Sequence, residues 1–545
     1  MNYVVGVDIG TQSTKALLIS TQGAIVAQAS VGYQVEQPEP LWAQQWPDVW
    51  LKAVYQAVAN AVASSSIQPN DIKAICVSSL YGGSGIPVDT AMMPLHPCLI
   101  WMDRRATTEA DWVRQNIDLA YLHDTTGNGV DSYYGYTKML WIKRNRPDVW
   151  ARTHYLLPPN SYVQYHLSGC VAVDHSSAGN IGGVYDIKQR TWSVPLLERL
   201  GIDPQLMPQR LVDSGEVIGE LLPSPARLMG LSPGIPVVAG GVDAAMATLA
   251  AGVLTPGNHV AMLGTSMCWG FVNRRTDAHL GLISMPYVHK PADYLYIFGG
   301  AITAGASISW FREQFCTREK HAAAMGVGVD VHQLMEDEAG KTPPGADGLV
   351  FLPYMMGERS PIWDAQASGA YVGLSLYHTR AHLYRAVLEG LGYALRHNIE
   401  RGRQGAERLD PELIVVGGAA ASDLWMQIIA DITGYPVLTI EQAVEAPLGA
   451  AMLAALATGD IDDLASVRGW RTLERRATPN PRTQALYDQL FSVYCDLYPA
   501  LKPSMHRLAG LPPTADEPLK LPTPLNIPPA PPAVEGTSAY LQPSG

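Results

Sequence analysis

Cysteine is scarce in this sequence, and the few cysteines are not arranged in pairs. The 545-residue chain carries 6 of them, and none shares a C-x-x-C spacing with another. This scatter argues against a zinc ribbon, an iron–sulfur centre and a disulfide framework. We therefore expect reduced, mostly buried thiols in a cytoplasmic protein. The cysteines are Cys76, Cys98, Cys170, Cys268, Cys316 and Cys495.

The sequence also lacks long apolar runs and a surplus of basic residues. No stretch reaches eighteen uninterrupted apolar residues, and no basic segment leads into an apolar one at the N-terminus, so membrane spanning and secretion are disfavoured. The net charge is −12, which disfavours nucleic acid or an anionic membrane as a partner. A small molecule or a protein is left as the main partner.

Alternating strands and helices occur twice along the chain. With 545 residues, 47% hydrophobic and 16% charged, the chain is long enough for two or three globular units. Because the alternation begins afresh after about residue 255, we expect two α/β domains with related openings. The expected strands are 3–8, 15–20, 24–33, 72–79, 97–102, 259–266, 267–272, 295–302 and 413–418. The expected helices are 46–65, 106–116, 137–145, 381–399 and 445–457.

Proline is concentrated at the C-terminal end of the chain. Residues 502–545 contain 11 of the 41 prolines. Proline lacks the backbone N–H that regular helices and central strands use. From Lys502 onward we expect an extended arm or a disordered tail, with packing across a dimer as an alternative.

The stretch DIGTQSTK lies between the first two expected strands. A tight turn with several N–H and hydroxyl donors can hold an anion such as a phosphate, and a carboxylate beside it can hold Mg²⁺ through water. An ordinary hairpin turn, with hydroxyls bonded only to the backbone, is the alternative. The candidate residues are Asp8, Gly10, Thr11, Ser13, Thr14 and Lys15.

A similar strand–turn–strand design, LGTSMCWG, opens the second half of the chain. Gly264, Thr265 and Ser266 lie in its turn, so two turns could grip one polyphosphate from opposite sides of a cleft. A third glycine-rich turn follows the strand 413–418, where Gly417 and Gly418 would allow close approach of a ring or a phosphate and Ser422 would cap the next helix. The sequence AGKT at 339–342 does not complete a Walker A motif, and no G-x-G-x-x-G follows a strand.

Asp243 is isolated from other charged residues. Between Arg227 and Arg274 it is the only Asp, Glu, Lys or Arg. A lone carboxylate among glycines and alanines is costly unless it has a partner or a function. It could cap the helix that AAMATLAAG predicts, or it could carry catalysis.

Two longer stretches resemble the signatures of the FGGY carbohydrate kinases. GAYVGLSLYHTRAHLYRAVLE, residues 369–389, satisfies the C-terminal signature of that family, and YGYTKMLWIKRN departs from the N-terminal one only at Gly135. The resemblance implies an α/β protein with two actin-like, ribonuclease H-like domains of the sugar kinase, actin and heat-shock ATPase fold and a cleft between them. The matching positions in the first stretch are Gly369, Tyr371, Gly373, Leu374, His382, Leu383, Ala386, Val387, Leu388 and Glu389.

The resemblance also implies roles for the candidate residues. Asp243, in GGVDAAMA, would be the general base and, with Asp8, would lie at the Mg²⁺ of the bound ATP. Residues 1–245 would bind the sugar and carry the first phosphate turn, 246–501 would bind the nucleotide, and 502–545 would form the tail. A homodimer is common in the family. Further nucleotide contacts would come from Gly300 and Gly305, and Glu445 and Gly449 would lie in the helix beside the nucleotide.

The sugar is the least defined part of this interpretation. Relatives read their acceptor near residues 77–89, where xylulose kinases show Gln-Met-His-Gly and glycerol kinases show Asn-Gln-Arg-Glu. This chain has Leu80, Tyr81, Gly82 and Gly83, a replacement expected to leave more room. We expect a ketopentose such as xylulose or ribulose, with another polyol, a tetritol or an actin-like ATPase switch as alternatives. Further acceptor contacts are expected from Trp101, Asp103 and Tyr133.

Overall fold

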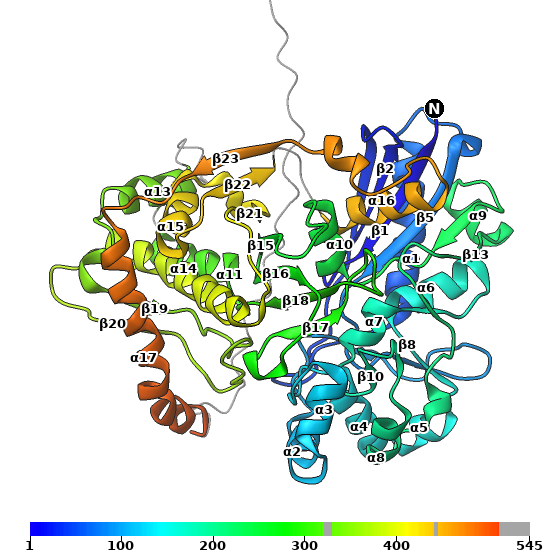
Figure 1. Cartoon of the computed structure of the whole chain (residues 1–545), viewed down its shortest axis with the longest axis horizontal. Helices are drawn as coiled ribbons and strands as arrows, with labels where there is room; N and C mark the ends of the chain where they lie inside the picture. The colour runs from blue at the N-terminus through cyan, green and yellow to red at the C-terminus, as the bar shows by residue number, and fades with distance from the viewer. Residues whose placement is uncertain (318, 321–329, 441–444, 512–545) are drawn as a thin grey trace, which may run out of the picture.

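The computed structural model describes residues 1–317, 319–320, 330–440 and 445–511. Two sheets, one in each half of the chain, form the frame of the molecule (Figure 1). The first sheet has the order β13-β14-β5-β1-β2-β3 and the second has the order β17-β18-β16-β15-β21-β22-β23. The strands of the first sheet are β1 (Tyr3–Ile9), β2 (Ser13–Ser20), β3 (Ile25–Gly32), β5 (Ile72–Ser79), β13 (Val217–Glu220) and β14 (Pro236–Val238). Those of the second are β15 (His259–Leu263), β16 (Met267–Asn273), β17 (Ile283–Pro286), β18 (Leu295–Gly299), β21 (Leu413–Val416), β22 (Val437–Ile440) and β23 (Leu473–Ala477).

The two sheets repeat one pattern of neighbours and directions. In the first, β1 pairs antiparallel with β2 and parallel with β5, and β5 pairs parallel with β14. In the second, β15 pairs antiparallel with β16 and parallel with β21, which pairs parallel with β22. The expected pair of α/β domains with related openings is therefore confirmed. The predicted strand 97–102 is wrong except at β7 (Cys98–Leu99), because only this dipeptide finds a partner strand, β4 (Gln44–Gln45).

Helices cover both sheets, and shorter elements fill the segments between the strands. The helices of the first half are α1 (Pro47–Ala63), α2 (Thr107–Asn116), α3 (Leu119–Thr126), α4 (Gly135–Asn145), α5 (Pro147–Arg152), α6 (Pro159–Ser168), α7 (His175–Asn180), α8 (Val194–Arg199), α9 (Pro223–Met229) and α10 (Asp243–Ala250). Those of the second half are α11 (Gly305–Phe315), α13 (Val331–Gly340), α14 (Arg380–Gly405), α15 (Asp423–Thr433), α16 (Ala446–Ala457) and α17 (Gln484–Ala509). The remaining strands are β6 (Ile86–Val88), β8 (Tyr155–Leu157), β9 (Val173–Asp174), β10 (Tyr185–Asp186), β11 (Thr191–Trp192), β12 (Leu211–Val212), β19 (Val350–Leu352) and β20 (Ala370–Val372).

Helix α16 lies directly against the first sheet, although it comes from the second half of the chain (Figure 1). A Cβ atom at Gly6 of β1 would lie 1.9 Å from the carbonyl oxygen of Pro447. A Cβ atom at Gly449 would lie 2.2 Å from the carbonyl oxygen of Met246 in α10. Only glycine allows the strand and the two helices to approach so closely. The sequence EAPLGAA therefore serves packing between the halves.

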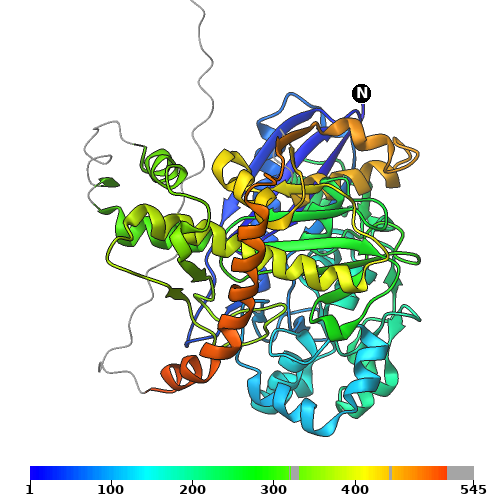
Figure 2. The same ribbon diagram turned by 60° about the vertical axis from the view of Figure 1, so that its left-hand side comes forward.

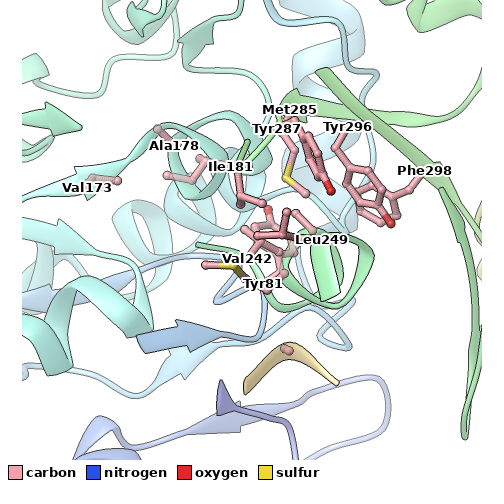
Figure 3. Close-up of a cluster of buried hydrophobic side chains, with 14 of the residues drawn as sticks. Tyr81, Val173, Ala178, Ile181, Val242, Leu249, Met285, Tyr287, Tyr296 and Phe298 are labelled. Atoms are coloured by element: carbon pink, nitrogen blue, oxygen red, sulfur yellow. The ribbon is translucent and has the colours of Figure 1, made fainter. Parts of the chain in front are cut away.

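Aromatic and aliphatic side chains from both halves share one core between the sheets (Figure 3). Val242 and Leu249 of the first half lie in the same cluster as Tyr296 and Phe298 of β18. All four are nearly inaccessible to water. Burying such side chains stabilises a fold by about 1.5–3 kcal/mol each. The junction that carries Asp243 is thus built on a rigid apolar base.

Helix α17 extends further than the proline content indicates. It runs along the second half and continues past Lys502 to Ala509, with Pro503 inside it (Figure 2). Tyr487 and Tyr494 bury one face of this helix, and this packing outweighs the cost of the internal prolines. The expectation of an extended arm from Lys502 is wrong for residues 502–509, and residues 512–545 lie outside the described part of the chain.

The six cysteines are all free thiols, as expected. Cys76, Cys98 and Cys316 are buried, and the other three are partly buried. Among the described helices, none is both long enough and apolar enough to cross a membrane.

Candidate active site

Asp243 is the first residue of α10, at the junction between the two halves. The chain reaches it through two glycines that no other residue could replace without strain. Gly240 has φ +63°, and a Cβ atom there would lie 2.1 Å from the carbonyl oxygen of Val77. A Cβ atom at Gly241 would lie 2.5 Å from the hydroxyl of Ser176. The glycines let α10 start close to the end of β5, where Asp243 enters the site.

A buried polar chain fixes the start of α10. The Ser176 hydroxyl donates to Oδ1 of Asp174 (2.5 Å) and accepts the backbone N–H of Val242 (3.1 Å). Asn160 donates to the other Asp174 oxygen (2.9 Å). Burial raises the pKa of Asp174, and these hydrogen bonds oppose the rise. The sequence analysis missed this support because its residues lie far from Asp243 along the chain.

The Asp243 carboxylate lies near enough to Asp8, close to the end of β1, for the charge of Asp8 to act on it. Its Oδ1 accepts the N–H of Ala244 (2.6 Å), so it satisfies one N–H at the start of α10 while Val242 occupies the capping position. Burial raises the pKa of Asp243, the negative charge of Asp8 raises it further, and Arg359 opposes this. A carboxylate with a raised pKa is better suited to accept a proton near neutral pH.

Burial also raises the pKa of Asp8. The Ser78 hydroxyl, which donates to Asp8 Oδ1 (2.8 Å), and the charge of Lys15 oppose this rise. Two facing carboxylates suit a divalent cation, because Mg²⁺ is commonly held by one or two carboxylates together with water and phosphate oxygens. No group of three or more His, Cys, Asp or Glu residues suited to a metal occurs in the described part of the chain.

The turn after β1 carries most of the predicted phosphate donors. Gly10 closes it by donating its N–H to the carbonyl of Ser13 (2.9 Å). The Thr11 hydroxyl accepts the indole N–H of Trp101 (3.0 Å), which links the turn to the predicted acceptor side. Lys15 pairs with Glu445 of the second half (2.5 Å), so its cation spans the junction between the halves.

Thr14 differs from the other residues of this turn. Its side chain is fully buried and its hydroxyl shares a hydrogen bond with Tyr33 (3.2 Å). Successive side chains of a strand point to opposite faces of the sheet, so Thr14 lies on a buried face while Ser13 stays partly exposed. The hydroxyl of Thr14 therefore supports the turn, and the predicted contact of this hydroxyl with phosphate is corrected.

The second predicted turn lies at the start of α11. Gly264 and Thr265 are exposed, and the carbonyl of Thr265 accepts the N–H groups of Ala304 (2.9 Å) and Ala306 (3.1 Å). Gly305 donates to the carbonyl of Gly264 (2.9 Å). The N-terminus of this 11-residue helix thus lies against the turn, where its dipole favours an anion.

Gly300 and Ser266 complete this side of the site. Ser266 accepts the N–H of Gly264 through its carbonyl (3.0 Å), leaving its side chain partly exposed. Gly300 donates its N–H to the Ser360 hydroxyl (2.8 Å), and a Cβ atom there would lie 2.0 Å from the carbonyl oxygen of Met267. The structure thus requires glycine at 300 for close packing of the backbone.

The predicted adenosine turn lies beside the second phosphate turn. Strand β21 runs parallel to β15, so Gly417 emerges at the same edge of the sheet as Gly264. Gly417 has φ +100°, and a Cβ atom there would lie 2.5 Å from the carbonyl oxygen of Leu263. Gly418 is exposed with open space around it. Ser422 caps α15 by accepting the N–H of Trp425 (3.1 Å), as the sequence predicts.

The loop at residues 80–83 is closely packed. Leu80 and Tyr81 are buried, and the Tyr81 hydroxyl accepts the N–H of Gly135 (2.5 Å). A Cβ atom at Gly82 would lie 2.3 Å from Pro159, and one at Gly83 would lie 2.1 Å from the carbonyl oxygen of Leu99. The expectation that these glycines leave more room for the acceptor is therefore wrong, because Pro159 and Leu99 pack directly against them.

Asp103 is not free to accept hydrogen bonds from a sugar. It is fully buried, and its Oδ2 accepts the N–H of Ala43 (2.6 Å) and the Nε–H of Arg105 (2.8 Å). Its Oδ1 accepts the backbone N–H of Arg105 (3.1 Å). We therefore correct its predicted role from acceptor binding to support of the loop that carries Trp101.

Trp101 and Tyr133, the other predicted acceptor contacts, both lie close to residues of the second half. Trp101 is partly buried, and the Arg359 guanidinium lies over its ring, 5.2 Å from the centroid. Tyr133 is buried and contacts the ring of Trp363 from the second half. Burial raises the pKa of Tyr133, and the charges of Arg359 and Asp243 also act on it. The two aromatic rings thus lie near the candidate base.

Sequence analysis missed the charged pair Glu358 and Arg359. Both belong to the segment between β19 and β20 of the second half, and both are buried. Burial raises the pKa of Glu358 to about 7, while hydrogen bonds from the N–H groups of Arg359 and Ile302 oppose the rise. The sequence could have revealed this pair, because in GERSP two adjacent charged residues stand among small residues.

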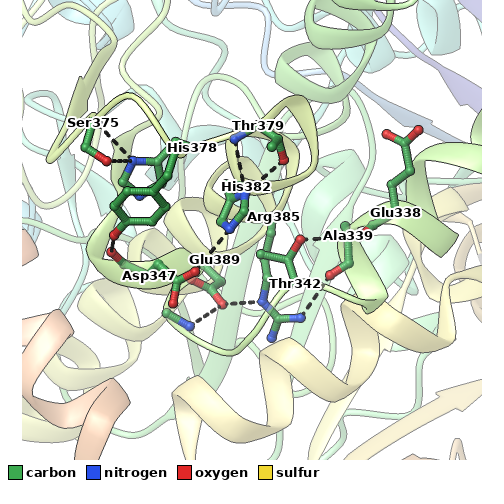
Figure 4. Close-up of polar contacts among 12 residues, drawn as sticks. Glu338, Ala339, Thr342, Asp347, Ser375, His378, Thr379, His382, Arg385 and Glu389 are labelled. Atoms are coloured by element: carbon green, nitrogen blue, oxygen red, sulfur yellow. Dashed lines mark hydrogen bonds and ion pairs between the residues drawn. The ribbon is translucent and has the colours of Figure 1, made fainter.

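The C-terminal signature stretch holds α14 and its neighbours in place (Figure 4). His382 accepts the N–H of Thr379 (3.1 Å). Glu389 is buried and bonds Arg385 (2.8 Å) and the N–H of Gly345 (2.9 Å). The signature residues His382 and Glu389 therefore support the fold and take no part in the candidate catalytic site.

The fold and the site together define a phosphotransferase of the two-domain actin-like ATPase class. Turns able to hold phosphate come from both halves, and a carboxylate able to accept a proton lies where the halves meet. Such an arrangement serves phosphoryl transfer, in which positioning and electrostatics supply most of the catalysis.

Comparison with known proteins identifies the family. Residues 3–250 match the N-terminal domain of the FGGY family of carbohydrate kinases, and residues 259–458 match its C-terminal domain. The chain belongs to this family. It is therefore an ATP-using carbohydrate kinase, a phosphotransferase with an alcohol group as acceptor.

Relatives cover nearly the whole chain. It is 30% identical over 501 residues to a xylulose kinase of Bacillus subtilis, covering 91% of this chain and 97% of the relative. It is 28% identical to a gluconokinase of Bacillus licheniformis, covering 93% and 98%. A ligand-bound xylulose kinase from Lactobacillus acidophilus has a similar structure, with TM-score 0.85, 25% identity, and coverage of 93% of this chain and 100% of that one.

Proposed function

We propose that this enzyme transfers the γ-phosphoryl group of ATP to a hydroxyl of a ketopentose such as xylulose or ribulose. The observation that carries the proposal is the position of Asp243 at the junction of the halves, near enough to Asp8 for the charge of Asp8 to act on it. The names of the relatives support a pentulose as the acceptor.

In the proposed reaction, Asp243 orients the attacking hydroxyl and takes its proton as the new P–O bond forms. The bond between the γ-phosphorus and the bridging oxygen breaks, and ADP leaves with that electron pair. Lys15, Thr11 and the turn at Gly264 support the phosphates through charge and hydrogen bonds. We assign sugar binding and the first phosphate turn to residues 1–245 and nucleotide binding to 246–501.

Mg²⁺ is the proposed metal of the reaction. Asp8 and Asp243 would hold it, since the negative charge of Asp8 raises the pKa of Asp243 and a cation would relieve that repulsion. When bound, Mg²⁺ would neutralise part of the phosphate charge. The adenine and ribose would lie along Gly417 and Gly418, where open space adjoins the backbone.

Coupled ADP release across a panel of ketopentoses, tetritols, pentitols, glycerol and gluconate tests this function. We expect a ketopentose to stimulate the wild type strongly. Asp243→Asn should lower sugar-dependent turnover by about 10²–10⁴-fold, the usual contribution of a general base, while ATP binding persists. Asp148→Asn, an exposed aspartate in the first turn of α5, is the matched control. Near-full activity of Asp243→Asn would refute the base assignment. ATP binding without stimulation by any sugar would refute the sugar kinase proposal.

A further inference from the structure

Three buried polar atoms on the acceptor side have no hydrogen-bond partner. They are Nε of Arg104, Oε2 of Glu358 and Nε of Arg359. The three residues are 8%, 2% and 8% exposed. Leaving such groups unpaired costs about 1–3 kcal/mol each, and more for charged groups. The charges of Arg104 and Arg359 both act on Glu358, so the three residues lie near one another and together point to a ligand that completes them.

The remaining polar atoms of these residues hold them in position. Oε1 of Glu358 accepts the N–H groups of Ile302 (2.9 Å) and Arg359 (2.8 Å), which leaves Oε2 free. Arg104 pairs through Nη1 with Asp131 (2.8 Å). These contacts fix two of the three side chains independently of any ligand.

Arg359 has no carboxylate within ion-pairing distance among the residues described. Its Nη2 makes only long contacts, 3.5 Å, with the carbonyl oxygens of Met267 and Ala301. The guanidinium lies over Trp101, and its charge acts on both Asp243 and Tyr133. Arg359 therefore lies near the candidate base and the two aromatic rings, and the charge of Arg104 also acts on Tyr133.

We propose that Glu358 and Arg359, with Arg104 opposite them, bind the hydroxyl groups of the acceptor and select a neutral polyol over a sugar acid. The inference rests on the proposed sugar kinase activity and names the residues that read its substrate. A hydroxyl both donates and accepts, so vicinal hydroxyls can satisfy the Glu358 acceptor and the two arginine donors together. Asp131 already balances the charge of Arg104, so Glu358 and Arg359 leave the site neutral, and a ligand carboxylate would face repulsion from Glu358.

Glu358 and Arg359 supply the charged side chains that the loop at residues 80–83 lacks. That loop is packed against Pro159 and Leu99 and offers no charged side chain. Glu358 and Arg359 bring a charged acceptor and donor from the second half, whereas Trp101 and Arg104 belong to the first. Because the unpaired atoms are buried, the protein must open to admit the sugar to them and close again around it.

Steady-state kinetics of Arg359→Met and Glu358→Gln test the proposal at pH 8, above the pKa of about 7 that burial gives Glu358. We expect each change to raise the KM for the ketopentose by about 10–100-fold, the loss of one hydrogen bond to a charged group. The KM for ATP should change by less than about threefold. Glu358→Gln should also tighten competitive inhibition by gluconate, since the repelling charge is removed.

Arg396→Met is the matched control. Arg396 also carries a buried Nε with no hydrogen bond, but it lies on α14 over Phe491. We expect no change in either KM, and thermal unfolding of all three variants reports whether they fold.

The outcomes separate this inference from the proposed function. If the wild type is active and both Arg359→Met and Glu358→Gln fold, an unchanged KM for the ketopentose would show that the pair only joins the halves. That result would overturn this inference but not the proposed function. A wild type that phosphorylates gluconate in preference to ketopentoses would overturn both. A wild type that no sugar stimulates would refute the kinase proposal itself.

Discussion

The two proposed phosphate turns are built on the same backbone plan but differ in charge. Each joins two antiparallel strands, β1 to β2 and β15 to β16, and each is closed by a glycine N–H bonded to a carbonyl further along the turn. The first turn is flanked by Asp8 and Lys15, whereas the second, at Gly264, carries no charged side chain. The same strand–turn–strand backbone can therefore be used with charged side chains beside the turn or without them.

The surroundings of the turns explain the difference. The second turn lies against the N-terminus of α11, whose dipole already favours an anion without a lysine. Among the described residues, no backbone hydrogen bond joins the first turn to the first turn of a helix, and its Thr11 is instead bonded to Trp101. We infer that the first turn couples phosphate to sugar and base, while the second only holds phosphate.

The largest expected effect comes from removing the charge that distinguishes the first turn. Asp8→Asn should lower kcat by about 10²–10³-fold, the range for losing a preorganised electrostatic group, whereas Ser266→Ala in the second turn should cost much less. Because Asp8 raises the pKa of Asp243, and the base works only when ionised, kcat/KM should rise with pH through that pKa. In Asp8→Asn the midpoint should move to lower pH. An unshifted pH profile would show that the two carboxylates are not coupled.

Paired threonine variants sharpen the comparison. Thr11→Val removes the hydroxyl bonded to Trp101 and should raise the KM for both sugar and ATP, by roughly tenfold for a lost hydrogen bond in a charged site. Thr265→Val should raise the KM for ATP alone. The measurement is a full two-substrate kinetic matrix for each variant. If Thr11→Val and Thr265→Val changed the KM for the sugar equally, the two turns would not differ in their coupling to the sugar.

The smallest effects concern backbone packing in the turns. A Cβ atom at Gly10 would lie 2.9 Å from the carbonyl oxygen of Ser13, whereas at Gly264 the nearest atom, the carbonyl oxygen of Ser266, lies 4.0 Å away. We expect Gly10→Ala to lower the free energy of unfolding by about 1–3 kcal/mol and Gly264→Ala to change it by less than about 0.5 kcal/mol. Urea unfolding monitored by circular dichroism compares them. A larger loss in Gly264→Ala would contradict the packing described.

Much of this fold is readable from the sequence because its signals are local. Alternation of strands and helices revealed both sheets, and the helix predicted at 46–65 corresponds to α1, where Pro47 starts the helix and Trp50, Val54 and Val58 bury one face. The dipeptide Cys98–Leu99 shows the limit: an apolar run forms a strand only where a partner strand lies beside it.

The site was predictable where a residue type alone implied a function. The isolation of Asp243 and the glycine turns could be seen without a structure. The saturation of Asp103 by Ala43 and Arg105, and the approach of Arg359 to Trp101, could not, because they depend on segments that meet only in the folded chain. The tight packing at Gly82 was missed for the same reason.

The close contact of Gly6 with Pro447 has a consequence for how the protein is made. Strand β1 is synthesised long before α16, the helix that covers it, because most of the described chain lies between them. At about 5–20 residues per second, synthesis of the intervening chain takes on the order of tens of seconds. During that time the face of the first sheet that α16 covers lacks this cover, and we expect chaperones to protect it until α16 emerges.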